Sequence, residues 1–269
     1  MSATPPVPRP VTVPEFRAAK ARGEKLAVVT AYDYTSARLA DTAGVDCLLV
    51  GDSLGMVVQG HATALPVTLG QIAYHTRCVV RGTQRALIVA DMPFLSYQVS
   101  PAQAVRNAGM LIKNAGAHAV KLEGGQRMAD AIRAVVNAGI PVMGHIGLTP
   151  QSVHLLGGFK VQRDAEQLLA DAKAVEEAGA FSLVVESVPA EVGAQITKAV
   201  GIPTIGIGAG PACDGQVLVL HDMLGLTGGK PPRFVRNFLA GAASVEAALA
   251  SDVAEVRSRS FPDDTLHGY

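Results

Sequence analysis

The sequence predicts an α/β protein built as a (β/α)8 TIM barrel with an extra N-terminal helix. Eight short apolar runs alternate with helical segments along the chain. The runs are continuous in Val, Ile and Leu, which is typical of parallel strands covered on both faces. The 269 residues exceed the common ~100–200 of one domain, but single barrels reach about 250. An open doubly wound sheet fits the same alternation, and the lack of an obvious edge strand favours the barrel.

The strands follow directly from the apolar runs. In chain order we expect strands at 25–33, 46–53, 85–93, 117–125, 140–147, 180–188, 202–210 and 215–222. Apolar residues at helical spacing predict helices over 68–82, 100–116, 164–179 and 190–201. Residues 13–23 predict the extra helix, placed to close the bottom of the barrel. The gap at 211–214 is too short for a full crossover, so the seventh helix should be shortened.

Local signals mark where helices begin and end. Ser100 followed by Pro101 suits an N-cap and a first-turn residue. Small residue–Gly pairs before the strands suit the left-handed residue that follows a helix, and they end in Gly44, Gly116, Gly139 and Gly179. The expected organisation is a Pro-rich arm over 1–12, one barrel domain over 13–256 and a C-terminal tail over 257–269, where periodicity is lost.

Composition excludes several classes of protein. A formal net charge of zero argues against a nucleic-acid partner. No apolar run approaches the ~18 residues of a membrane span, and the N-terminus lacks an apolar signal region. Cys47, Cys78 and Cys213 are too scattered for a disulfide framework or a zinc site. With only 17% charged residues, we expect a cytoplasmic homo-oligomer that buries part of its outer surface.

Polar residues gather where the predicted strands end. In a barrel these carboxyl ends meet at one mouth, where the chemistry takes place. The strand-end residues are Asp33, Asp52, Ser53, Asp91, Lys121, Glu123, His145, Glu186, His221 and Asp222. Four converging carboxylates would repel one another and raise one another's pKa values. A hard divalent cation resolves this, and carboxylate oxygens that leave room for water and substrate suit Mg²⁺.

Simpler interpretations exist for some of these residues. Asp33 fits a helix cap or turn. Lys121 and Glu123 alternate on one strand and could form an internal salt bridge. His145 fits a hydrogen-bonded core histidine as well as a site residue. The Gly-rich segment 206–215 could cradle an anion or simply form a tight turn.

The strand-end residues together indicate a magnesium-assisted enzyme that acts on a small anionic oxo compound. A metal chelated by a 2-oxo acid stabilises negative charge on the keto oxygen, which makes the neighbouring C–H acidic. Glu186, held away from the metal, would remove this proton. The resulting enolate could then attack an electrophilic carbon.

Six motifs resemble the ketopantoate hydroxymethyltransferase family over roughly residues 12–240. They are VTAYDYTSARLADTAGVDCLLVGDSLGMVVQGH, VADMPFLSY, AVKLEGG, GHIGLTPQSVHLLGGFKVQ, VVESVP and IGIGAGPACDGQVLVLHD. The resemblance implies a (β/α)8 barrel, a cytoplasmic homodecamer and a step of pantothenate biosynthesis. In that step 3-methyl-2-oxobutanoate takes a one-carbon unit from 5,10-methylenetetrahydrofolate and becomes 2-dehydropantoate.

The resemblance also implies roles for matching positions. Asp52 and Asp91 resemble residues that hold Mg²⁺ and contact the oxo acid, and Glu123 resembles a third acid of the metal site. Ser53 resembles the residue that binds the substrate carboxylate, and Lys121 resembles a substrate-contacting lysine.

The proton acceptor of the family corresponds to Glu186 in VVESVP, in agreement with the strand-end interpretation. The sequence departs from many relatives at 159–167, where its loop is shorter. This departure bears on how the site closes rather than on its chemistry. Beyond about residue 245 the similarity is loose.

Three rival functions remain open from the sequence. A magnesium-dependent C–C lyase or mutase of the phosphoenolpyruvate mutase/isocitrate lyase type would also use strand-end acids. A second mechanism would use Lys121 as a Schiff-base nucleophile. A non-catalytic barrel that binds an organic acid is the third.

Overall fold

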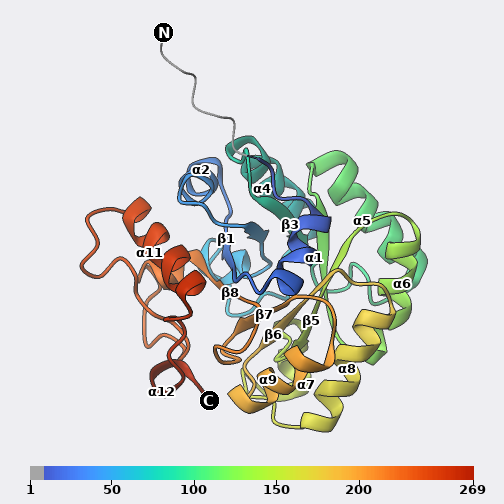
Figure 1. Ribbon diagram of the computed structural model, residues 1–269. Helices are drawn as coiled ribbons and strands as arrows, with labels where there is room; N and C mark the ends of the chain where they lie inside the picture. Colours follow the sequence, from blue (N-terminus) through green and yellow to red (C-terminus); the bar gives the residue numbers. More distant parts are fainter. Residues whose placement is uncertain (1–8) are drawn as a thin grey trace.

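Eight parallel strands close into one barrel in the order of the sequence. The computed structural model describes residues 9–269, so most of the predicted Pro-rich arm lies outside the described residues. Figure 1 shows the strands at the centre with helices around them. The strands are β1 (Leu26–Thr30), β2 (Cys47–Val50), β3 (Leu87–Asp91), β4 (Ala119–Glu123), β5 (Val142–Gly147), β6 (Ser182–Glu186), β7 (Thr204–Ile207) and β8 (Gly215–Leu218). All eight predicted strands and the barrel itself are thereby confirmed.

Helices follow most strands and cover the outside of the barrel. The long ones are α1 (Val13–Arg22), α2 (Tyr34–Thr42), α4 (Leu69–Gly82), α5 (Pro101–Ala115), α6 (Ala129–Asn137), α8 (Ala165–Glu177), α9 (Ala190–Ala199) and α11 (Val245–Ser258). Single turns are α3 (Leu54–Val57), α7 (Val153–Leu156), α10 (Leu220–Met223), α12 (Asp264–His267), and the 3-10 turns η1 (Gln126–Met128) and η2 (Pro150–Ser152). The five helices predicted from periodicity are present, each within two residues of its expected bounds.

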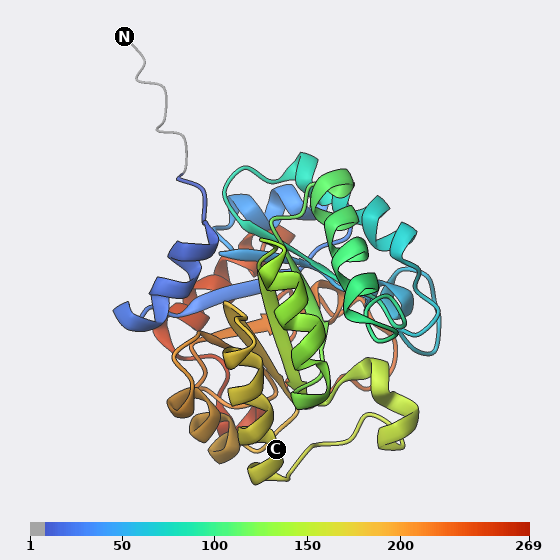
Figure 2. The same ribbon diagram turned by 90° about the vertical axis from the view of Figure 1, so that its right-hand side faces the viewer.

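The predicted helix signals act as expected. Ser100 Oγ accepts a hydrogen bond from the backbone N–H of Gln103, with Pro101 in the first turn of α5. The glycines after α2, α5, α6 and α8 all have positive φ values. Helix α1 closes the bottom of the barrel, since its buried Phe16 packs edge-on against Phe181 at 5.9 Å between ring centroids. Figure 2 shows α1 at the end of the barrel opposite the loop that joins α7 to α8.

The outer ring differs from the prediction at the seventh and eighth positions. Instead of a shortened seventh helix, residues 208–214 form a turn. In this turn Gly208 and Gly210 have positive φ values, which glycine adopts without steric cost. Helix α11, which the sequence did not indicate, packs against α2 and β1. The expected C-terminal tail packs against the rest of the domain. The ring centroid of its Phe261 lies 5.2 Å from that of Phe238, in the segment between α10 and α11.

Strand register sets the positions of the polar residues at the top of the barrel. Asp91 on β3 pairs with Lys121 on β4, and Glu123 pairs with His145 on β5. Glu186 on β6 then pairs with Gly147 of β5. The pairing advances by two residues from Lys121 to Glu123 on β4 and again from His145 to Gly147 on β5. Because the strands of a closed barrel are tilted, this stagger keeps the side chains in one layer at the carboxyl ends of four neighbouring strands.

Two further expectations can be examined in residues 9–269. All three cysteines are free, with Cys47 and Cys213 buried, as their spacing predicted. None of the helices in this part of the chain is long and apolar enough to cross a membrane.

Candidate active site

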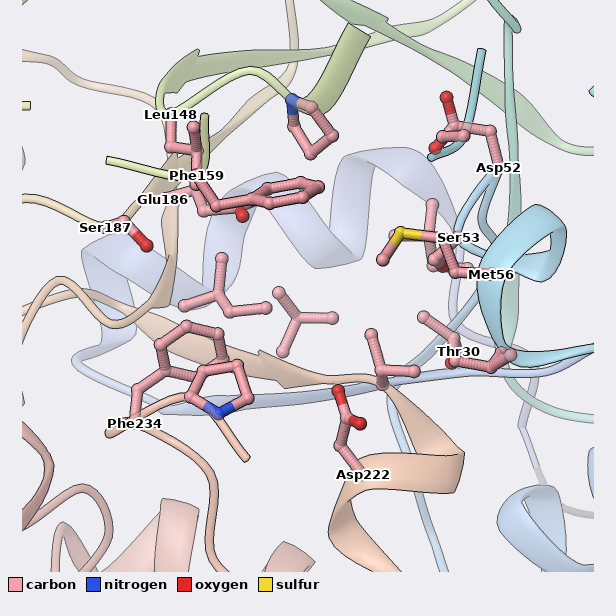
Figure 3. A pocket seen from close by; sticks show the side chains of 18 of the residues that line it. Thr30, Asp52, Ser53, Met56, Leu148, Phe159, Glu186, Ser187, Asp222 and Phe234 are labelled. Carbon is pink, nitrogen blue, oxygen red and sulfur yellow. The ribbon is translucent and has the colours of Figure 1, made fainter. Parts of the chain in front are cut away.

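A pocket of about 720 Å³ opens at the carboxyl ends of the strands. Figure 3 shows its lining with Asp52, Ser53 and Met56 on one side and Glu186, Ser187 and Phe159 on another. Eight of the ten predicted strand-end residues line this pocket, namely Asp52, Ser53, Asp91, Lys121, Glu123, His145, Glu186 and Asp222. His221 does not line it. Asp33 instead caps α2, because its Oδ1 accepts the N–H groups of Thr35 and Ser36 at 2.8 and 3.0 Å.

Glycines allow the chain to turn closely at two strand ends. A Cβ on Gly51 would lie 2.7 Å from Ser53 Oγ, so any larger residue where β2 turns into α3 would displace this hydroxyl. The turn aims the N–H of Asp52 at Asp91 Oδ2, 2.9 Å away. Gly147 at the end of β5 has φ +90°, and a Cβ there would lie 2.2 Å from the carbonyl oxygen of Glu186. The carboxyl ends of β2, β5 and β6 therefore depend on these two glycines for their close approach.

The carboxylates of Asp52, Asp91 and Glu123 are buried close to one another. Burial, together with the charges of Asp91 and Glu123, raises the pKa of Asp52 well above its usual range. Burial also opposes ionisation of Glu123, but hydrogen bonding to His145 and the positive charges of His145 and Lys121 outweigh it and lower the pKa of Glu123. Asp52 is therefore the acid of this group that the protein leaves least compensated.

Lys121 stands between an acid and an imidazole. Its Nζ lies 2.9 Å from Asp91 Oδ1 and 3.3 Å from His145 Nδ1. Burial opposes the charge, but Asp91, Glu123 and Asp52 outweigh it and raise the pKa of Lys121 above its usual value. The salt bridge that the alternation on β4 suggested is thus formed with Asp91, on the neighbouring strand, rather than with Glu123.

His145 links two glutamates. Its Nδ1 lies 3.5 Å from Glu123 Oε1, and its Nε2 lies 3.1 Å from Glu186 Oε2. Burial and the charge of Lys121 oppose protonation of the ring, but Glu123 and Glu186 raise the pKa of His145 to about 9. His145 is therefore an ionised part of the site at neutral pH, and the Glu186 carboxylate is held at the pocket wall beside it.

Gln151 joins several of these groups and was missed by sequence reasoning. Its Nε2 donates to Asp52 Oδ2 and to the carbonyl of Met92, both at 2.9 Å. Its backbone N–H donates to Glu123 Oε2 at 2.9 Å, and its Oε1 accepts from Tyr97 Oη at 2.8 Å. The only signal for it in the sequence is a polar residue in the loop that follows β5.

Ser53 has a partner that the sequence did not indicate. Tyr32 Oη lies 2.9 Å from Ser53 Oγ, and Tyr32 comes from the end of β1, far away in the sequence. If Tyr32 donates this hydrogen bond, the hydroxyl proton of Ser53 is free to point into the pocket.

The far side of the pocket is largely apolar. Ile207, Val217 and Val219 line it together with Phe234, which packs against Tyr269 at 6.2 Å between ring centroids. One carboxylate, Asp222, interrupts this surface and points into the cavity (Figure 3).

Comparison with known proteins identifies the family. A family model described as ketopantoate hydroxymethyltransferase matches residues 10–264. The chain belongs to this family. A relative in Moorella thermoacetica, named 3-methyl-2-oxobutanoate hydroxymethyltransferase, is 57% identical over 94% of this chain and 96% of its own. A relative of the same name in Methylobacillus flagellatus is 60% identical over 90% of this chain and 94% of its own.

Solved structures of other enzymes share the barrel of this hydroxymethyltransferase family member. A 2,3-dimethylmalate lyase of the phosphoenolpyruvate mutase/isocitrate lyase superfamily matches with TM-score 0.59 and 20% identity, over 78% of this chain and 81% of that one. An oxaloacetate acetylhydrolase matches with TM-score 0.61 and 14% identity, over 97% and 99%. At these identities the likeness concerns the fold alone. It gives no separate support to the rival lyase or mutase activity.

The donor set of the pocket can be tested for a metal ion. Within the described part of the chain, no group of three or more Asp, Glu, His or Cys side chains stands ready as a ligand set. Two buried carboxylates are available, however. Asp91 Oδ1 is paired with Lys121 Nζ at 2.9 Å but accepts no well-oriented hydrogen bond. Mg²⁺ is usually bound through one or two carboxylates, with water and substrate completing its octahedron. Asp52 and Asp91 fit an ion held in that way.

Proposed function

We propose that the protein transfers a hydroxymethyl group from 5,10-methylenetetrahydrofolate to 3-methyl-2-oxobutanoate, giving 2-dehydropantoate in pantothenate biosynthesis. The observation that carries this proposal is the single layer of acids and bases on β2 to β6, in a chain of this family. An oxo acid requires a cationic, hydrogen-bonding cradle and a base beside its C3. The layer supplies both.

Mg²⁺ is part of the proposal, with Asp52 and Asp91 as its protein ligands. Bound there, the ion would polarise the keto oxygen of the substrate and stabilise the negative charge that develops on it. Glu123 would add negative charge beside the ion as the third acid of the site, while it is held by Gln151 and His145.

The substrate carboxylate would be held by neighbouring donors. Ser53 can donate its hydroxyl proton, supported by Tyr32. Lys121 supplies a positive charge next to Asp91. Its raised pKa keeps the amine protonated, whereas a Schiff-base nucleophile must be neutral. We therefore assign Lys121 to binding the oxo acid rather than to covalent catalysis.

Glu186 would act as the base that removes the C3 proton. Its carboxylate reaches the pocket from the end of β6 and is partly exposed to it, with 14% of the side chain accessible. His145 Nε2 lies 3.1 Å from Glu186 Oε2 and would form an ion pair with it. Once C3 has lost its proton, the carbanionic carbon attacks the one-carbon unit of the folate. Of the two C–N bonds of that unit, one is replaced by the new C–C bond and the other by a bond to the oxygen of a water molecule. The C3 proton and one proton of that water complete the two N–H groups of tetrahydrofolate.

The proton-removal step can be measured without folate. Wild-type protein with Mg²⁺ in D₂O should exchange the C3 hydrogen of 3-methyl-2-oxobutanoate, as followed by proton NMR. Glu186→Gln should slow exchange and hydroxymethyl transfer together by roughly 10²–10⁴-fold, the usual worth of a general base. Glu191→Gln, on the exposed face of α9, is the matched control and should leave both rates unchanged.

Two outcomes would contradict the proposal, one its catalytic function and the other the role of Glu186. Absence of exchange in the wild-type protein with Mg²⁺ would argue for a non-catalytic barrel. Exchange at the wild-type rate in Glu186→Gln, with transfer alone impaired, would show that another group is the base. The homodecamer and the cytoplasmic location implied by the resemblance stay predictions.

A further inference from the structure

The proposed chemistry leaves one buried carboxylate of the pocket unused. Asp222 lies in α10, directly after β8, and its side chain is half-buried among apolar residues of the pocket wall. Thr227 Oγ1 donates to its Oδ1 at 2.7 Å. Within residues 9–269 no donor group reaches its Oδ2. Burial raises the pKa of Asp222, because it makes the ionised carboxylate less favourable. A ligand that donates hydrogen bonds to this carboxylate would offset the free-energy cost of burying its charge.

The pocket also has more room than a small oxo acid needs. Its volume of about 720 Å³ is typical of sites for drug-sized ligands. Figure 3 shows Asp222 pointing into the cavity from a side that carries neither Asp52 nor Glu186. The unused part is walled by Ile207, Val217 and Phe234, which suits the faces of a flat ring.

We propose that Asp222 recognises the 2-amino-4-oxopyrimidine edge of the folate pterin ring. This inference rests on the proposed function, which requires a folate in the same pocket. The ring N3–H and the 2-amino group present two parallel N–H donors, which match the two oxygens of a carboxylate. The one-carbon unit is carried at the other end of the bicyclic ring. Asp222 would therefore orient that unit toward the oxo-acid side of the cavity.

The rim of the pocket agrees with this orientation. Lys230 and His61 line the pocket and are exposed to solvent. A folate that enters ring-first leaves its glutamate carboxylates outside, where these two side chains lie. Phe159, at the same pocket and 52% exposed, is placed to cover the middle of such a ligand.

The test separates the two half-reactions of the full-length protein with Mg²⁺. Asp222→Asn should retain C3 deuterium exchange within about twofold of the wild type, because exchange needs no folate. Its KM for 5,10-methylenetetrahydrofolate should rise about 10- to 100-fold, the usual worth of a bidentate pair. The matched control is Asp33→Asn, which removes a nearby negative charge but keeps a residue that caps α2 well. Its KM for the folate should not rise.

A second measurement begins with the wild-type protein, so its main result does not depend on whether a variant folds. Tetrahydrofolate and its 2-desamino-2-methyl analogue should differ in Kd by about 10- to 100-fold, because the analogue lacks one donor to Asp222. In Asp222→Asn this ratio should fall toward unity. Equal Kd values for the two folates in the wild type, or an unchanged folate KM in Asp222→Asn, would overturn the inference. So would a parallel loss of exchange in Asp222→Asn. A wild type without exchange would refute the proposed function instead.

Discussion

Replacing Gln151 by methionine should destabilise the protein strongly, although the residue takes no part in the proposed chemistry. Methionine fills a similar volume but can neither donate to Asp52 and Met92 nor accept well from Tyr97. A hydrogen bond to a charged group is worth about 1.5–3 kcal/mol and one between neutral groups about 0.5–1.5. Summed over these three bonds, the loss is about 2.5–6 kcal/mol of the free energy of unfolding, by the same values.

The assay is urea unfolding followed by circular dichroism, with and without Mg²⁺. We expect a lower midpoint at an unchanged slope, because the folded structure still buries the same surface. Turnover should fall as well, by about 10²-fold, since Asp52 loses the amide that fixes its carboxylate. Gln98→Met is the control, because it removes one half-buried hydrogen bond to Gln151 and one long hydrogen bond from the N–H of Tyr97, but none to a charged group. A loss of less than about 1 kcal/mol in Gln151→Met would refute the reasoning.

Three other changes probe charge at and away from the site. Asp52→Ala or Asp91→Ala should abolish turnover in a folded protein, and a chelator should do the same reversibly; full activity after chelation would exclude the metal. Lys121→Met should raise the KM for the oxo acid as well as lower kcat, as steady-state kinetics can show. Asp252 in α11 is buried, and burial raises its pKa to about 7. The native state therefore keeps this proton between about pH 4 and pH 7 while the unfolded chain loses it, so stability falls as pH rises through that range. Asp252→Asn should gain up to about 4 kcal/mol at pH 8 and nothing near pH 4, as measured by urea unfolding at both values.

The strands could be predicted because each depends on a short, local apolar run. The expected runs were a few residues too long, as at 25–33, where the chain leaves the sheet after Thr30 so that Asp33 can cap α2. Helix α11 was missed because it is held in place by packing on α2 and β1 rather than by a strong apolar stripe of its own. Similarly, the connection at 208–214 contains no helix because its seven residues are fewer than the dozen or so that a helical crossover needs.

Which residues would meet in the pocket could be predicted for one topological reason. Parallel strands of a barrel all end on the same side, so acids that are distant in the sequence meet without any knowledge of the loops. The sequence did not predict the contribution of three other residues, because their contacts depend on loop conformation and on partners from other strands. These residues are Gln151, Tyr97 and Tyr32. Asp222 could be placed at a strand end, but its free oxygen and apolar surroundings depend on how residues 227–234 fold over the pocket.

The charges of the layer lead to one further argument for a divalent cation. Asp52, Asp91, Glu123 and Glu186 bring four negative charges when ionised. Lys121 pairs with Asp91, and a protonated His145 lies between Glu123 and Glu186. The protein thus supplies two positive charges against four negative ones, and Asp52 has only the neutral amide of Gln151 as its partner. Two uncompensated charges in a buried layer would be costly, and this cost is visible in the raised pKa of Asp52. An ion with a double positive charge beside Asp52 and Asp91 removes the imbalance, whereas a monovalent ion or an additional lysine would leave half of it.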